Sequence, residues 1–310
     1  MVTSKGGLRN GAAVALGLTT AAGVATAGYA AFVERNLFGL REEVLPILPA
    51  GSRPLRVLHL SDIHMVPRQA AKAKWLKGLA ELQPDLVVNT GDNLSHPKAL
   101  APLLDALEPL LDFPGVFVPG SNDYYAPRLQ NPFRYLGGPS STAGQQLKEL
   151  PWQQMFARFG SAGWVDLTNR SQSIGLKGTR LDFSGVDDPH LNRDRFVGFP
   201  NGSSTAHEAP YLRVGVAHAP YQRVLDTFTD GGAQLILAGH THGGQVCIPG
   251  YGALVSNCDL PTWRARGLTQ WENNGRTVPL NVSAGIGTSR FAPVRFACRP
   301  EAVLLTLTPR

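Results

Sequence analysis

Aspartate and histidine residues directly follow several short apolar segments of this sequence. The segment 55–60 runs into Asp62 and His64, and the segment 86–88 runs into Gly91 and Asp92. Later apolar segments run into four further polar residues, namely Asn122, His218, His240 and His242. Carboxylate and imidazole are ligands that divalent ions such as Mn, Fe and Zn accept. Taken singly these patterns mean little, but the ordered set indicates a metal site.

The elements that carry these residues must bring them together. In open α/β sheets, side chains at the carboxyl ends of neighbouring strands converge in one crevice. Side chains of an extended chain alternate between two faces, so Asp62 and His64 are expected to point the same way. The same alternation is expected to aim His240 and His242 into one site.

The spacing of apolar residues predicts alternating strands and helices. We expect early strands at 55–60, 86–88 and 116–118, separated by helices at 71–82 and 98–111. Later strands are expected at 181–186, 212–217, 234–237, 280–283 and 303–307, with a helix near 152–159. The segment 126–151 is rich in Pro, Gly, Ser and Gln and is expected to be a surface insertion beside the site. This alternation predicts an α/β sandwich.

Composition divides the chain of 310 residues into three parts. Residues 1–33 form an N-terminal segment, and residues 34–54 form a connector in which Pro46, Pro49, Gly51 and Pro54 break any long helix. Residues 55–310 form one catalytic domain.

The N-terminal segment is predicted to meet a membrane. Lys5 and Arg9 precede 24 uncharged residues, 10–33, a length that can span a hydrocarbon core of about 30 Å. A retained single-pass anchor would place the catalytic domain outside the cytoplasm, because positive residues stay on the cytoplasmic side. Two alternatives are a secreted protein cleaved after Ala25-Thr26-Ala27 and a helix that packs on a soluble domain.

Charge and cysteine content narrow the class of partner. The net charge is +6, but the basic residues form no run and are not interleaved with aromatic residues, which argues against a nucleic-acid partner. The three cysteines form no zinc-finger spacing. Cys247 and Cys258 could form a disulfide in an oxidising compartment, and the alternative is three small buried thiols.

The ordered motifs resemble the calcineurin-like metallophosphoesterase family from about residue 55 to the C-terminus. The stretches Gly239-His-Thr-His-Gly-Gly-Gln and Gly185-Val-Asp-Asp-Pro-His resemble a membrane-associated bacterial branch of it. The resemblance implies a four-layer αββα sandwich of two mixed β-sheets. It also implies two divalent metal ions, one held by Asp62, His64, Asp92 and His242. The other would be held by Asp92, an asparagine after the third strand, His218 and His240, with Asp92 bridging both ions.

This resemblance implies a hydrolase that cleaves phosphate mono- or diesters by attack of a metal-bridging hydroxide. Two cations about 3.5–4 Å apart stabilise both the attacking and the leaving oxygen in such sites. The expected substrate is a phosphorylated small molecule or lipid. One alternative is a pyrophosphate hydrolase acting on a lipid-linked sugar nucleotide, and another is a non-catalytic metal-binding scaffold.

The third motif departs from the family pattern of Gly-Asn-His followed by an acid. The chain has Gly120, Ser121, Asn122 and Asp123 at this point. Alignment without a gap places Ser121 at the ligand position, whereas a shift of one residue places Asn122 there. We expect Asn122 to be the ligand, because an amide oxygen reaches farther than a serine hydroxyl. Asp123 is then expected to hold the loop through backbone N–H groups.

Two further groups of residues have competing interpretations. Asp187, Asp188 and His190 could form a loop at the rim of the site, with His190 replacing the missing histidine, but ordinary turn chemistry is the favoured interpretation. His59 lies inside the first predicted strand and is expected to pack in the core rather than bind metal.

Overall fold

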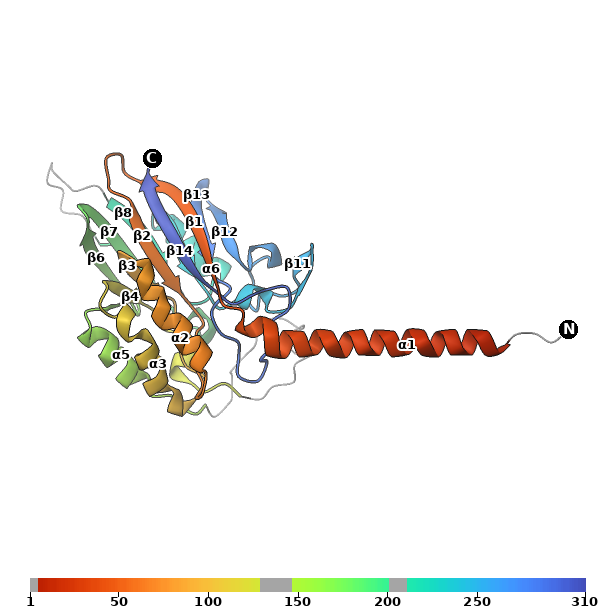
Figure 1. Cartoon of the computed structure of the whole chain (residues 1–310). Coiled ribbons are helices and arrows are strands. Elements are labelled where there is room, and N and C mark those ends of the chain that lie inside the picture. The colour runs from red at the N-terminus through yellow and green to blue at the C-terminus, as the bar shows by residue number, and fades with distance from the viewer. Residues whose placement is uncertain (1–4, 129–146, 201–210) are drawn as a thin grey trace.

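The computed structural model describes residues 5–128, 147–200 and 211–310 and contains two six-stranded sheets (Figure 1). The first sheet has the strand order β1 (Gly39–Leu48), β14 (Glu301–Pro309), β2 (Leu55–Leu60), β3 (Leu86–Asn89), β4 (Gly115–Phe117) and β5 (Val165–Asp166). The second has the order β12 (Gly267–Asn273), β13 (Arg276–Val282), β9 (Leu235–Ala238), β8 (Tyr211–Val216), β7 (Thr179–Gly185) and β6 (Arg170–Leu176).

Both sheets are mixed, and each contains four consecutive parallel strands. Strands β2 to β5 are parallel, and so are β13, β9, β8 and β7. Antiparallel pairs join β14 to β2, β12 to β13 and β6 to β7. The parallel strands β2, β3, β4, β8 and β9 lead into the candidate ligands.

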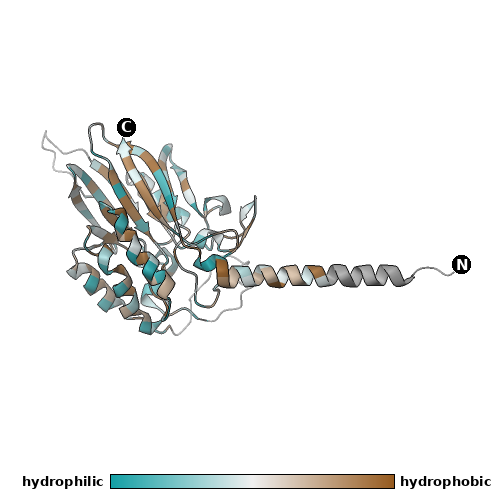
Figure 2. Cartoon of the chain, in the orientation of Figure 1, coloured by the Kyte–Doolittle hydropathy of each residue, from teal (hydrophilic) through white to brown (hydrophobic). Residues whose placement is uncertain are grey.

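Three apolar clusters separate four layers. The central cluster joins the facing sides of the two sheets, with Val88 and Val116 from one sheet and Phe183 and Val214 from the other. A second cluster packs α2 (Ala70–Gly78), α3 (Leu100–Leu107) and α5 (Trp152–Ser161) against the first sheet. A third packs α6 (Gln222–Asp230) against the second sheet. Figure 2 shows the hydrophobic residues along the strands. The expected αββα sandwich is therefore confirmed.

The strands and helices predicted from apolar spacing are present with small shifts at their ends. The helix expected at 98–111 is divided into α3 and two short helical turns, Pro97–Ala99 and Glu108–Leu110. Within the insertion expected at 126–151, residues 129–146 lie outside the described residues. Its far end returns beside the site loop, because Leu150 N donates to Tyr124 O at 2.8 Å.

The segment predicted to be an irregular connector contains a ten-residue strand, β1. It pairs in parallel with β14 from Gly39 to Leu48 and forms the edge of the first sheet. Pro46 lacks an N–H group but is tolerated on an edge strand, and the pairing register shifts between Pro46 and Leu48. The prediction of an irregular connector was therefore wrong for this segment, because its prolines exclude a helix but not an edge strand.

An N-terminal helix, α1 (Lys5–Gly28), extends away from the sandwich (Figure 1). It continues through a short π-helix, Tyr29–Val33, and a helical turn, Glu34–Asn36, into β1. Within the part of the chain that the structure describes, no helix combines the length and apolar character needed to cross a membrane.

Candidate metal centre

Two loops that follow β2 and β3 run side by side and carry the first candidate ligands. Asp62 N donates to Gly91 O, and His64 N donates to Asp92 O, both at 2.9 Å. The backbone therefore continues the pairing of β2 with β3 beyond the ends of the strands. It fixes the spacing between the Asp62–His64 segment and Asp92.

Most candidate ligands adopt a left-handed backbone conformation, which costs a non-glycine residue about 1–2 kcal/mol. The ligands with φ between 46° and 68° are Asp62, His64, Asp92, His240 and His242. This finding corrects the expectation that strand alternation aims the ligand pairs, because β2 and β9 end before the ligands begin. Turns, rather than the pleat of a strand, direct these side chains.

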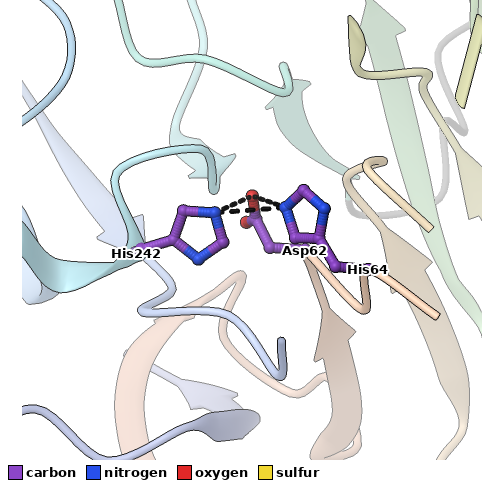
Figure 3. A group of neighbouring side chains, drawn as sticks. All are labelled: Asp62, His64 and His242. Atoms are coloured by element: carbon purple, nitrogen blue, oxygen red, sulfur yellow. Dashed lines mark hydrogen bonds and ion pairs between the residues drawn. The ribbon is translucent and has the colours of Figure 1, made fainter. Parts of the chain in front are cut away.

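One group of three potential ligands consists of Asp62, His64 and His242, all buried. Figure 3 shows both imidazole rings directed toward the Asp62 carboxylate. Asp62 Oδ1 lies 3.8 Å from His64 Nε2 and 3.5 Å from His242 Nε2, and the two Nε2 atoms are 3.1 Å apart. The three atoms surround a point at which one cation could sit.

A second group consists of Asp62, Asp92 and His218, also buried. Asp92 Oδ2 lies 3.5 Å from His218 Nε2 and 3.4 Å from His64 Nε2. Asp92, a member of the second group, therefore also lies close to His64 of the first group, and Asp62 belongs to both groups. Two adjacent cation positions that share carboxylates fit this arrangement.

The hydrogen bonds of the histidines favour a cation at these positions. Two atoms that face the site, Asp62 Oδ1 and His218 Nε2, are buried without a hydrogen-bond partner among the described residues. The opposite nitrogen of His218 lies 2.7 Å from Thr90 O, so it carries the proton and leaves Nε2 free to bind metal. His64 Nδ1 lies 2.8 Å from Ser95 Oγ, which likewise leaves its Nε2 facing the site.

The charges of the site are strongly coupled. Burial opposes protonation of His218, but the Asp92, Asp62 and Asp188 carboxylates raise its pKa well above the ordinary value. Burial would raise the pKa of Asp92, but His218, His64 and the Asn122 amide hold it well below the ordinary value. Burial raises the pKa of Asp62 to about 6. Closely packed carboxylates of this kind require positive charge nearby.

His240 lies beside these groups but belongs to neither of them. Its ring centroid is 5.1 Å from that of His218, and its Nε2 is 3.1 Å from Asn257 O. A proton on Nε2 satisfies that carbonyl and leaves Nδ1 as the nitrogen available to a metal. Burial and the neighbouring histidines His190 and His218 lower the pKa of His240 well below its ordinary value, which favours the neutral form.

The irregular third motif brings Asn122, not Ser121, against Asp92. Asn122 N donates to Asp92 Oδ1 at 2.7 Å, and Asn122 Nδ2 donates to Asp92 Oδ2 at 2.8 Å. Gly120 is required here, because a Cβ atom would lie 2.3 Å from Asp92 Oδ1. The motif therefore keeps an amide beside the central carboxylate.

Asp123 holds this loop as expected. Its carboxylate accepts hydrogen bonds at 2.8 Å from the backbone N–H groups of Asp92, Asn93 and Gly120. Burial raises the pKa of Asp123 to about 6, although these N–H groups favour the ionised form. The residue at the position of the usual acid thus supports the loop and does not face the ligands.

His190 lies at the rim of the site, which the sequence analysis did not favour. Its ring centroid is 4.9 Å from that of His240, and its Nδ1 is 3.1 Å from Tyr221 Oη. Asp188 performs the expected turn chemistry by accepting from His190 N at 2.9 Å. The segment is therefore a turn, as favoured from the sequence, and this turn brings His190 beside His240. His59, as expected, is buried in the core and contacts Thr90 Oγ1 at 2.9 Å.

Sequence analysis missed a fully buried arginine behind the first group of ligands. Arg295 donates to the carbonyl oxygens of His242 and Ala284 at 2.7 Å and of Gly287 at 2.6 Å. Its Nη2 also lies 3.2 Å from His242 Nδ1. Because Gly287 packs against Ile63 O and His64 Cβ, Arg295 joins the loop of His242 to the loop of His64. No local motif marks such a residue.

A buried lysine supports the same side of the site. Lys72 Nζ donates to Ile63 O at 2.7 Å, between the ligands Asp62 and His64. Burial, followed by the charges of Arg295 and Arg35, lowers the pKa of Lys72 to about 7. Its place on α2 gave no signal in the sequence, because a lysine on a short helix usually faces solvent.

All three cysteines are free and buried. Cys247 contacts Cys298 rather than Cys258, and both thiols lie within 3.4 Å of Gly243 O. The fold therefore brings Cys247 close to Cys298, and not to Cys258 as considered from the sequence.

Comparisons with known proteins agree with this geometry. The family described as calcineurin-like phosphoesterase matches residues 55–244. The uncharacterized metallophosphoesterase YkuE of Bacillus subtilis is 26% identical over 307 residues, which cover 95% of this chain and 93% of that protein. The phosphodiesterase YaeI of Escherichia coli is 26% identical over 297 residues, 93% of this chain and 96% of that protein. The crystal structure of TT1561 of Thermus thermophilus has a TM-score of 0.40 and 11% identity, covering 76% of this chain and 91% of that one.

Proposed function

Because the chain belongs to the calcineurin-like phosphoesterase family, we propose that it hydrolyses phosphate esters with the help of two divalent cations. The observation that carries this proposal is the pair of buried ligand groups that share Asp62. Asp62 Oδ1 and His218 Nε2 face these positions without a hydrogen-bond partner among the described residues. Such atoms are costly to bury unless a cation completes them.

The donor set assigns the ligands. Asp62, His64 and His242 would hold one cation, and Asp92 would contribute to both. The other cation would take His218, Asn122 and His240. Carboxylate, amide and imidazole donors suit Mn, Fe or Zn. When bound, two such cations lower the pKa of water and stabilise charge on the phosphoryl oxygens.

The chain's own groups keep these donors ready. Thr90 O and Ser95 Oγ hold the tautomers of His218 and His64, and Asp123 holds the loop of Asn122. His190 would be the proton donor that the third motif lacks, and its position beside His240 and 3.1 Å from Tyr221 Oη supports this role.

A diester or pyrophosphate link suits this site better than a simple monoester. The Escherichia coli relative is named a phosphodiesterase and matches almost the whole chain. For a pyrophosphate link, the leaving group is a phosphate that needs little protonation, which also fits a third motif without histidine. A lipid-linked sugar nucleotide, cleaved at its pyrophosphate, is the second candidate substrate on the same grounds.

The test combines metal analysis with turnover of bis(4-nitrophenyl) phosphate and 4-nitrophenyl phosphate in Mn, Fe or Zn. We expect about two ions per chain and faster cleavage of the diester. Asp62→Ala should lose both metal and activity, whereas Asp105→Ala, a matched change of an exposed carboxylate, should retain both. Two bound ions without turnover of any ester or pyrophosphate would contradict the enzyme and favour a metal-binding scaffold.

We also propose that the N-terminal segment holds the domain at the outer side of a cell membrane. Residues 10–33 carry no charge and follow Lys5 and Arg9. The full chain should then remain with membranes after a high-salt wash. Recovery of a shortened protein beginning near Gly28 in the soluble fraction would instead indicate a cleaved signal.

A further inference from the structure

Exposed apolar side chains gather at one end of the molecule, on and around the hairpin formed by β10 (Cys247–Ile248) and β11 (Gly252–Ala253). Tyr251 is 74% exposed and Trp263 is 66% exposed. We call this set the hairpin face, and its members are Val246, Ile248, Tyr251, Leu254, Trp263 and Phe291.

Backbone contacts make the hairpin face continuous. β10 pairs with β11, and the short helix Thr262–Arg264, which carries Trp263, packs on β11. Val246 forms a parallel bridge with Phe296, and Gln245 Nε2 donates to Ala292 O at 2.8 Å. The segment after Phe291 therefore lies directly beside the hairpin.

The segment that follows α1 contacts the segment beside the hairpin. Arg295 N donates to Ala30 O at 3.0 Å, and Arg35 Nη1 donates to Pro293 O at 3.3 Å. Phe32, in the π-helix that follows α1, is 74% exposed. Figure 1 shows the hairpin and the base of α1 at one end of the sandwich, and Figure 2 shows hydrophobic residues along the described part of α1. The apolar surface therefore extends from the hairpin onto the helix.

The charges around the hairpin face are mostly positive. Residues 246–266 and 286–300 contain one acidic residue, Asp259, and five arginines, of which all but Arg295 are at least partly exposed. The Arg264 guanidinium lies 4.3 Å from the ring centroid of Trp263, and that of Arg290 lies 5.4 Å from Phe291. Arginine beside aromatic rings is suited to the boundary between apolar chains and anionic head groups.

We propose that the hairpin face rests on the surface of a lipid bilayer that contains anionic lipids. Its aromatic and aliphatic side chains would enter the head-group region, and the adjacent arginines would meet lipid phosphates. A second copy of this chain fits less well, because two faces with the same arginine excess would repel each other. This contact needs no membrane-spanning helix.

The location of the face has a consequence for the substrate, and that consequence rests on the proposed function. Val246 follows the ligand His242 by four residues. Leu254 leads to Asn257, whose carbonyl oxygen lies 3.1 Å from His240 Nε2. Docking would therefore bring the metal centre beside the head groups, where phosphate esters carried by lipids are presented.

A spin-label experiment on the full chain tests the docking without reference to activity. A nitroxide is attached at Tyr251→Cys or, as the matched control, at Val44→Cys, which is 67% exposed on β1, the edge strand of the first sheet and not part of the hairpin face. The native cysteines are buried, and unmutated protein measures any labelling of them. With phosphatidylglycerol vesicles, the label at 251 should gain accessibility to oxygen and lose accessibility to an aqueous nickel chelate. The label at 44 should not change.

Three results would overturn the docking. The label at 251 could stay aqueous although α1 holds the protein on vesicles, both labels could change equally, or phosphatidylcholine could give the same change as phosphatidylglycerol. The first result would show that the hairpin face does not contact lipid and would favour a protein partner for it. The second would show unspecific adsorption, and the third would remove the role of anionic lipid.

A second measurement tests the substrate consequence. Tyr251→Ser combined with Trp263→Ala should leave hydrolysis of a soluble ester unchanged. The same variant should lower hydrolysis of a phosphate ester carried in phosphatidylglycerol vesicles by roughly 10-fold or more, because two apolar side chains lose their burial. If the variant and the unmutated chain hydrolyse the vesicle-borne ester at equal rates, the lipid substrate is contradicted. If the unmutated chain does not hydrolyse the soluble ester at all, the proposed function itself is contradicted.

Discussion

The two halves of the metal centre are built differently. The half that contains His64 and His242 is closed, because Lys72 and Arg295 are buried behind it and hold the backbone of its loops. The half around Asn122 and His240 is more open, and its rim residue His190 is only partly buried. The first half is fixed by donors that never face the substrate, whereas the second leaves room for a substrate to contact its ligands.

The two halves also differ in how their residues match the expected motifs. The closed half has its expected ligands, each held in a strained left-handed turn by neighbouring loops. The open half has lost a histidine from the third motif and has His190, from another loop, nearby.

The largest effect is expected at Asp92, which joins the two halves. Asp92→Ala should abolish turnover and reduce bound metal to about one ion per chain or fewer, because two cations would otherwise repel at close range. Metal analysis and a diester assay measure both results. Two retained ions with a normal rate would remove the dinuclear assignment.

Arg295 tests whether the closed half depends on buried support. Arg295→Met should lower the free energy of unfolding by about 3–5 kcal/mol, because several buried carbonyl oxygens lose their donor. If the folded protein is recovered, its affinity for the first cation should fall roughly 10–100-fold. Denaturant unfolding and metal titration measure the two effects. Arg276→Met, at an exposed arginine on β13, is the control and should change neither.

Asn122 and Ser121 offer a matched pair in the open half. Asn122→Ala should weaken the second cation and lower turnover by roughly 10–100-fold, because Asp92 loses its amide neighbour. Ser121→Ala should change little. A larger effect of Ser121→Ala than of Asn122→Ala would assign the ligand to the serine.

His190 tests whether another loop compensates for the missing histidine. His190→Ala should slow esters with leaving groups of high pKa more than activated esters, by less than the roughly 10²–10⁴-fold of a fully effective general acid. Rates for a series of aryl diesters, plotted against the pKa of the leaving group, give a slope that measures this effect. An unchanged slope would leave the open half without a protein proton donor.

The smallest expected effect is on pH. The pKa of Asp62 is raised to about 6, mainly by burial, so its carboxyl binds a proton below that pH and competes with metal. Asp62 should therefore add no pH dependence to the metal affinity above pH 7, and its protonation should lower that affinity by about 10-fold per pH unit below 6. Isothermal titration at several pH values measures this trend. Affinity that does not change down to pH 5 would contradict it.

Local sequence signals were sufficient for much of this molecule. Apolar segments located the eight inner strands of the two sheets but not the edge strands β1, β5, β6 and β12. The residues after the inner strands located Asp62, Asp92 and His218. Strand β1 was missed because Pro46 suggested a break, although an edge strand tolerates proline. Arg295 could not be found, because its role depends on carbonyl groups that only the folded chain brings to it.

Strand β1 also has a mechanical consequence. It begins three residues after the helical turn that ends at Asn36, so a pull on α1 is transmitted into the domain along the axis of this strand. Its bonds to β14 run across that direction over the whole length of the parallel pair. These hydrogen bonds would therefore be loaded together in shear and would not break one after another. The edge of the first sheet is thus also the place at which the domain would bear a force applied through α1.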